Sequence, residues 1–137
     1  METSSVTGSK LHGRKEFSDF ALTLAAKFGS DVQVLAVARP PELPEDFETE
    51  AEIERAREHY ERDFALLGKL ADAVGIAPHF ETTVGHPAEQ IVHYAETHGV
   101  DHIVMGHRGK TFFERWLLGS VSKQVVHYAP CTTTIVR

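Results

Sequence analysis

Two hydrophobic patterns alternate along the chain. Residues 32–38 form a nearly continuous run of apolar and β-branched side chains, which is typical of a strand buried on both faces of a parallel sheet. Between Phe17 and Phe28 the apolar residues instead recur every three or four positions, which indicates a helix, and Gly29 follows as a stop signal. The same reasoning predicts helices over residues 14–28, 47–74, 87–98 and 120–128, and strands over residues 32–38, 79–84, 102–105 and 132–136.

Each predicted helix has an apolar stripe that we expect to face the core. In the first helix the stripe is Phe17, Phe20, Ala21, Leu24, Ala25 and Phe28. In the long helix it is Ile53, Ala56, Tyr60, Leu67, Ala71 and Val74. In the last two helices it is Ile91, Val92 and Ala95, and then Val121, Val125, Val126 and Ala129. We expect Gly75 and Gly99 to end the second and third helices.

Alternating strands and helices predict an α/β protein with a mainly parallel sheet and helices on both faces. Residues 1–13 fit this pattern least, because only Val6 is a candidate for a core strand. With 137 residues and no internal repeat, we expect one domain covering residues 1–137. In such sheets ligands bind at the carboxyl ends of the strands, near a switch in strand order.

A glycine-punctuated segment follows the predicted strand 102–105. Gly106 and Gly109 flank a short turn, and Gly119-Ser120 opens the last helix. Glycine N–H groups and a helix N-terminus both favour an anion. The segment therefore predicts a phosphate site, although the glycines could serve only as turns and Ser120 only as an N-cap.

Charge favours a small ligand over a polymer. The net charge is −6, which disfavours nucleic acid, and ten of the 20 acidic residues lie within residues 42–63. Basic side chains gather instead around the glycines: His107, Arg108, Lys110, Arg115 and Lys123. The chain has no apolar run of membrane-spanning length and no secretory signal, and its single cysteine suits the reducing cytoplasm, so we expect a cytoplasmic protein.

These residues resemble the universal stress protein family. Gly106, Gly109, Gly119 and Ser120 fit G-x2-G-x9-G-[S/T], the pattern of the ATP-binding branch, and Gly85-His86-Pro87 also agrees. The resemblance implies an open five-stranded sheet in order 3-2-1-4-5, of the Rossmann-like class typified by adenine nucleotide alpha hydrolases. It also implies ATP at the switch point, with any Mg²⁺ held mainly by the phosphates, and a homodimer through the last strand, Thr132–Val136.

The resemblance also assigns roles by position. Gly106, Gly109 and Gly119 would let the backbone approach the phosphates, with Ser120 and Val121 at the helix start. Independently of the resemblance, Arg108 or Lys110 could neutralise a phosphate, or each could be only a solvated charge of the loop. Met105 would line the ribose, and the backbone of Val37 would contact adenine. Thr7 stands where the family usually has an aspartate that contacts adenine, so it offers one hydroxyl instead. The first strand is thus either altered, or the start of the chain is displaced relative to the family.

Three functions remain open at this point. The first is a stress-response regulator that binds ATP and acts through dimer or protein-partner contacts. The second is an interaction module that has lost nucleotide binding, which Thr7 and the apolar residues within 112–118 would suit. The third is a slow ATP hydrolase. No catalytic triad, paired-carboxylate site or zinc-type histidine pair is present in the sequence, so we predict no catalytic residue and no protein-held metal.

Overall fold

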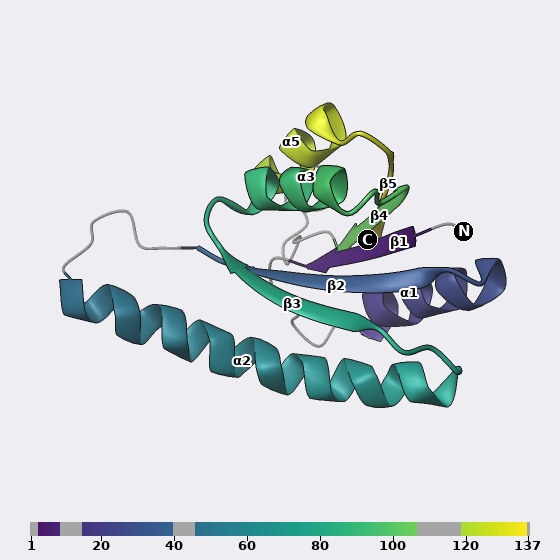
Figure 1. Ribbon diagram of the computed structural model, residues 1–137, viewed down its shortest axis with the longest axis horizontal. Coiled ribbons are helices and arrows are strands. Elements are labelled where there is room, and N and C mark those ends of the chain that lie inside the picture. Colours follow the sequence, from purple (N-terminus) through teal and green to yellow (C-terminus); the bar gives the residue numbers. More distant parts are fainter. Residues whose placement is uncertain (1–2, 9–14, 40–45, 107–118, 137) are drawn as a thin grey trace, which may run out of the picture.

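The computed structural model describes residues 3–8, 15–39, 46–106 and 119–136 (Figure 1). Its strands are β1 (Thr3–Gly8), β2 (Asp31–Ala38), β3 (His79–Val84), β4 (His102–Gly106) and β5 (Thr132–Val136). Its helices are α1 (Lys15–Phe28), α2 (Asp46–Ala73), α3 (Pro87–Thr97) and α5 (Ser120–Tyr128). The predicted α/β class with parallel strands is therefore confirmed.

The five strands form one parallel sheet in the order β3-β2-β1-β4-β5, the order that the family resemblance implies. Although its sequence is polar, β1 is the central strand, and Val6 pairs with Val34 on one side and Val104 on the other. From β1 the chain builds outward to β3 and then returns to add β4 and β5 on the other side. The switch in strand order thus lies between β1 and β4, where a ligand site is expected.

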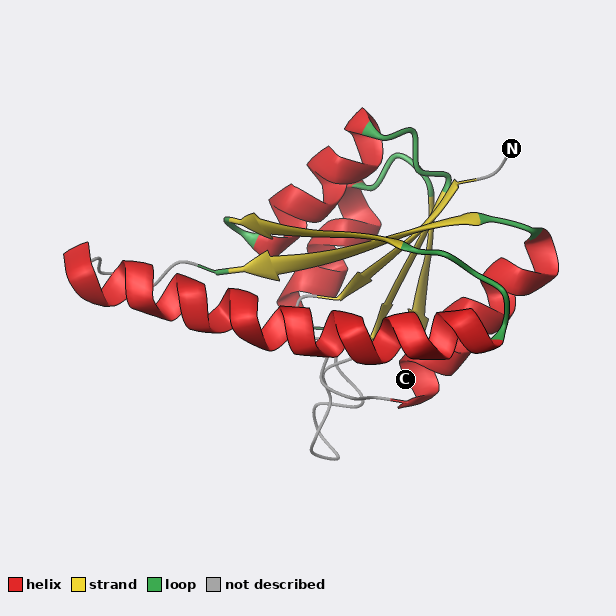
Figure 2. Cartoon of the chain, turned by 60° about the horizontal axis from the view of Figure 1, so that its bottom comes forward, coloured by secondary structure: helices red, strands yellow, loops and turns green. Residues whose placement is uncertain are grey.

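Helices cover both faces of the sheet, with α1 and α2 on one side and α3 and α5 on the other (Figures 1 and 2). Side chains of β2 alternate between these layers. Val32 and Val34 pack with the α1 and α2 side, whereas Leu35 and Val37 pack with the α3 and α5 side. The burial of β2 on both faces, as its apolar run predicts, is confirmed.

The predicted stripes are only partly correct. Phe20 is 43% exposed although it belongs to the predicted stripe, while Leu22, outside it, is 5% exposed. In α5, Val126 is likewise exposed and Ser122 buried. Adjacent residues point about 100° apart around a helix, so only one of two neighbouring apolar residues faces the sheet.

Two further stripe residues are exposed because of where they lie along the helix. Phe28 is the last residue of α1, and Val74 follows the last residue of α2, so both have fewer neighbours to cover them. The helix stops themselves are confirmed: Gly29, Gly75 and Gly99 all have positive φ angles. Within the described ranges, no helix is long and apolar enough to cross a membrane.

Candidate functional site

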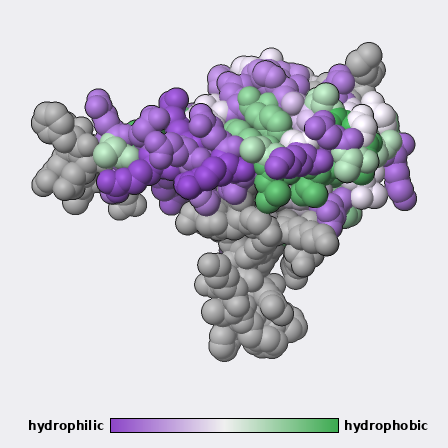
Figure 3. Space-filling model, turned by 90° about the horizontal axis from the view of Figure 1, so that it is seen from below, coloured by the Kyte–Doolittle hydropathy of each residue, from purple (hydrophilic) through white to green (hydrophobic). Residues whose placement is uncertain are grey.

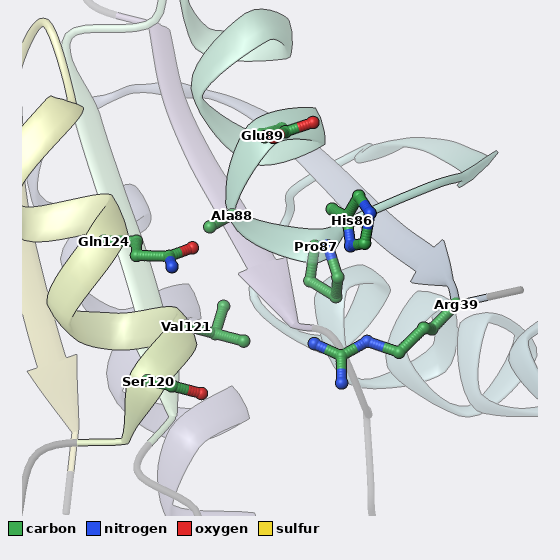
Figure 4. Close-up of a pocket in the computed structure, with 8 residues that line it drawn as sticks. All are labelled: Arg39, His86, Pro87, Ala88, Glu89, Ser120, Val121 and Gln124. Atoms are coloured by element: carbon green, nitrogen blue, oxygen red, sulfur yellow. The ribbon is translucent and has the colours of Figure 1, made fainter. Parts of the chain in front are cut away.

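A cavity of about 200 Å³ opens at the carboxyl edge of the sheet, between the starts of α3 and α5 (Figure 4). Arg39, directly after β2, forms one wall. The remaining lining residues come from the beginnings of the two helices: His86, Pro87, Ala88, Glu89, Ser120, Val121 and Gln124. Two helix N-termini and a cationic side chain therefore surround this cavity, which is a favourable setting for an anion.

The start of α3 is fixed by a short turn after β3. Gly85 has a φ of 151° and donates its N–H to the Ala38 carbonyl oxygen at 3.0 Å, which ties the turn to the end of β2. His86 is the N-cap and Pro87 occupies the first turn, where its missing N–H costs nothing. Pro87 and Ala88 are buried, so this wall of the cavity is rigidly packed.

The start of α5 exposes backbone donors. Gly119 is the N-cap, with φ −59° and ψ 157°, and its carbonyl oxygen accepts the first helical hydrogen bond, from Lys123 N at 2.9 Å. The alternative in which Ser120 serves as the N-cap is wrong, because Ser120 is already the first helical residue. The N–H groups of Ser120, Val121 and Ser122 precede that first bond and lack intrahelical acceptors.

The side chains that enter the cavity add a positive wall. In Figure 4 the Arg39 guanidinium extends between the start of α3 and the start of α5, while Glu89 lies farther along α3 and its carboxylate projects to the side of the helix. Ser120 and Gln124 add a hydroxyl and an amide from the opposite side. The cavity thus combines cationic and neutral polar groups with the two helix starts.

The end of β2 supplies a backbone acceptor at the switch point. The Ala38 carbonyl accepts the hydrogen bond from Gly85 N–H on the β3 side of β2. Carbonyl groups of successive strand residues point to opposite sides, so the Val37 carbonyl points to the β1 side. There β1 ends at Gly8, which pairs with Ala36, one residue before Val37. The Val37 carbonyl oxygen accepts a hydrogen bond from the Tyr60 hydroxyl of α2 at 3.1 Å, and Tyr60 is buried.

A polar cluster beneath α3 anchors the helix to the sheet. The Tyr94 hydroxyl donates to Gln33 Oε1 on β2 at 2.9 Å, and the Tyr94 ring stacks on His98 with centroids 3.8 Å apart. Burial, together with the nearby Glu81 carboxylate on β3, raises the pKa of Tyr94 to about 12. These contacts hold the helix whose first turn forms one wall of the cavity.

The described residues include most of the predicted site. Ser120 and Val121 line the cavity and Gly119 precedes them. Met105 and Val37 are both buried in the core cluster against which Val121 packs, and Gly106 ends β4. The backbone of Thr7 pairs with Leu35 in β1, but its side chain lies outside what the structure describes, as do Arg108 and Gly109.

Sequence reasoning missed Arg39, Gln124 and the first turn of α3 as parts of this cavity. A signal was available, because Arg39 directly follows the buried strand and Gly85-His86-Pro87 directly follows β3. Both positions are carboxyl ends of parallel strands, where ligands gather. Among the described residues, no three His, Cys, Asp or Glu side chains come together as a metal site.

Comparison with known proteins decides the family. The family model for universal stress proteins matches residues 13–137. The chain belongs to the universal stress protein family. A curated relative, universal stress protein MJ0531 of Methanocaldococcus jannaschii, is 34% identical over 125 residues, which cover 89% of this chain and 74% of the relative.

Solved structures share the fold of this universal stress protein. Universal stress protein UspA from Lactobacillus plantarum has a TM-score of 0.83 at 18% identity, with 100% of this chain and 99% of that chain covered. Two other structures hold adenine nucleotides. A universal stress protein in complex with cAMP has a TM-score of 0.70 at 21% identity, covering 98% of this chain and 97% of that one. The Archaeoglobus fulgidus protein in complex with dAMP has a TM-score of 0.71 at 19% identity, covering 98% of each chain.

Proposed function

We propose that this universal stress protein is a regulatory protein of the cytoplasm that binds ATP at the carboxyl edge of its sheet. The observation that carries the proposal is the cavity between the starts of α3 and α5, which Ser120 and Val121 line. These residues are also the end of the G-x2-G-x9-G-[S/T] pattern. Geometry and sequence spacing thus favour a phosphate at the same place.

The proposed ligand spans the switch point. Its phosphates meet the segment of Gly106, Arg108 and Gly109 and the helix start from Gly119 to Val121, and Mg²⁺ is held mainly by the phosphates. Its base lies at the end of β2, where the backbone of Val37 faces the space beyond β1. Met105 lines the ribose, and Thr7 offers one hydroxyl to the base.

Relatives support an adenine nucleotide as the class of ligand, because the structures with cAMP and dAMP have the same fold. The choice of ATP rests on the glycine pattern. Residues 1–137 act as one domain in this proposal, and β5 supports the dimer because it is an edge strand of the sheet with backbone groups available on its outer side.

A pair of substitutions at Gly119 tests the phosphate site without damaging the helix. Among the described residues other than its chain neighbours, no heavy atom lies within 4 Å of a Cβ atom added at Gly119, and the φ of Gly119 is not positive. Asn and Asp are both good N-caps, so Gly119→Asn and Gly119→Asp should fold as stably as the wild type. Only the aspartate places a negative charge beside the phosphates.

We expect isothermal titration calorimetry to give micromolar ATP binding for the wild type and a modest loss for Gly119→Asn. Gly119→Asp should bind at least about tenfold more weakly than Gly119→Asn, since the added charge repels the phosphates at close range. Equal affinities for the two variants would show that the start of α5 does not hold the phosphates. Absence of ATP binding by the folded wild type would favour an interaction module without nucleotide.

A further inference from the structure

Arg39 is a cation that the fold places in the cavity without a partner among the described residues. It is exposed, directly follows β2, and makes no hydrogen bond or ion pair with any residue of the described ranges. The acidic residue of the same lining, Glu89, lies farther along α3, and its carboxylate projects to the side of that helix (Figure 4). The charge of Arg39 is therefore available to a ligand.

The position of Arg39 relates it to both ends of the proposed nucleotide. It lies two residues after Val37, at the proposed base end, and its guanidinium extends toward Ser120 and Val121 at the phosphate end (Figure 4). A ligand that spans these two ends passes beside the guanidinium. Arginine is suited to phosphate because its planar donor fork matches two phosphate oxygens and because it stays charged at every physiological pH.

We propose that Arg39 is a specificity-determining residue that binds a phosphate group of the nucleotide, so that the site selects nucleotides over uncharged nucleosides. The inference rests on the proposed function and extends it to a residue outside the glycine segment. The phosphate is held from two sides, by the backbone donors at the start of α5 and by the guanidinium after β2. Adenosine, which lacks the phosphate, gains nothing from Arg39.

The alternative contact for an exposed arginine beside a base is stacking on the adenine ring. Stacking would stabilise adenosine, AMP and ATP to the same degree. Phosphate binding stabilises AMP and ATP alone, and it weakens as salt screens the charges. Ligand charge and salt therefore separate the two contacts.

The test is calorimetric titration of ATP, AMP and adenosine into the wild type, Arg39→Gln, Arg39→Lys and Arg62→Gln. Arg62 is an exposed arginine of α2, on the opposite face of the sheet, and serves as the matched control. We expect Arg39→Gln to bind ATP and AMP about tenfold more weakly and adenosine unchanged. Arg39→Lys should retain part of the affinity, Arg62→Gln should match the wild type, and high salt should reduce the difference between wild type and Arg39→Gln.

Two results would overturn the inference while leaving the proposed function intact. Equal weakening of adenosine and ATP in Arg39→Gln would assign Arg39 to the base, and unchanged ATP binding would remove it from the site. If the folded wild type binds neither ATP nor AMP, the proposed function fails, and the role of Arg39 fails with it. Circular dichroism should show unchanged folding in Arg39→Gln, because the side chain has no partner within the described residues.

Discussion

The turn between β3 and α3 provides a sharp test of how the cavity wall is built. Gly85 has a φ of 151°, a backbone conformation that L-residues with a side chain rarely adopt. A Cβ atom added there would also lie 2.8 Å from Gln90 Nε2 and 3.0 Å from Gln90 Cγ. We therefore expect Gly85→Ala to destabilise the protein through the backbone and, to a smaller extent, through Gln90.

The size of the effect follows from these two contributions. A non-glycine residue in so strained a conformation costs about 1–3 kcal/mol. Moving the flexible Gln90 side chain off its rotamer costs about 0.5–1.5 kcal/mol, while the lower entropy of the unfolded alanine chain returns about 0.4–1 kcal/mol. The net loss is about 2 kcal/mol of unfolding free energy, or roughly 4–8 °C in Tm for a chain of this size.

Urea unfolding of Gly85→Ala, Gln90→Ala and the double variant measures each part. The double variant should recover only the Gln90 share, since the backbone strain remains. Gly68→Ala is the control of opposite sign: Gly68 lies inside α2, where the nearest side-chain atoms to an added Cβ are those of the Phe80 ring at 3.9 Å. It should stabilise the helix by up to about 1 kcal/mol. A Gly85→Ala variant as stable as the wild type would refute the claim that this turn requires glycine.

Three further predictions concern the core around the site. Tyr60→Phe should lower the unfolding free energy by about 0.5–1.5 kcal/mol in urea titrations, because it loses the hydrogen bond to the Val37 carbonyl while keeping the ring. Ile91→Ala should cost about 2–5 kcal/mol by the same measurement, because Ile91 is 0% exposed, whereas Leu66→Ala on the surface of α2 should change little. Because the pKa of Tyr94 is raised to about 12 in the folded state, the neutral hydroxyl stabilises the protein fully below pH 10, and this stabilisation is lost as the pH rises toward 12. Between pH 10 and 12 the urea midpoint of Tyr94→Phe should therefore fall less than that of the wild type.

Each of these predictions has a control or a contrary outcome. Tyr128 is 66% exposed, so Tyr128→Phe should leave the unfolding free energy unchanged, and a loss equal to that of Tyr60→Phe would contradict the assignment of that hydrogen bond. A cost below about 1 kcal/mol for Ile91→Ala would contradict its place in the core. An identical decline in stability above pH 10 for wild type and Tyr94→Phe would show that Tyr94 does not titrate in this range.

The sequence predicts best those elements whose burial follows from local pattern. The bounds of α5 and β5 agree with prediction residue for residue, and β2 begins one residue earlier than predicted. Strand β1 carries no such pattern, because TSSVTG is polar apart from Val6. Its central place comes from pairing with β2 and β4, which is a property of the whole sheet.

In the site, too, some residues follow from the local sequence and others depend on the whole sheet. Ser120 belongs to the glycine segment, which is local in the sequence, and Val121 follows from the family resemblance; both residues line the cavity. Arg39 is about 80 residues before Ser120 in the chain. It reaches the cavity because β2 ends, and α5 begins, at the same edge of the sheet. Such a meeting depends on strand order, so spacing within any one segment does not reveal it.

In the apolar stripes of the helices, the sequence did not show which of two adjacent apolar residues faces the sheet. Val125 and Val126 are equally apolar, but only Val125 faces the sheet, with 0% exposure against 51%. The direction in which a helix presents its face is set by the sheet beneath it, so the pattern indicates the helix without fixing its rotation.

The central claim is that this universal stress protein holds a nucleotide by its phosphates at the edge of the sheet. Calorimetric titration of ATP into the folded wild-type protein tests that claim most directly. We expect saturable binding in the micromolar range with one site per chain. No detectable heat of binding at millimolar ATP, with the protein shown to be folded, would contradict it.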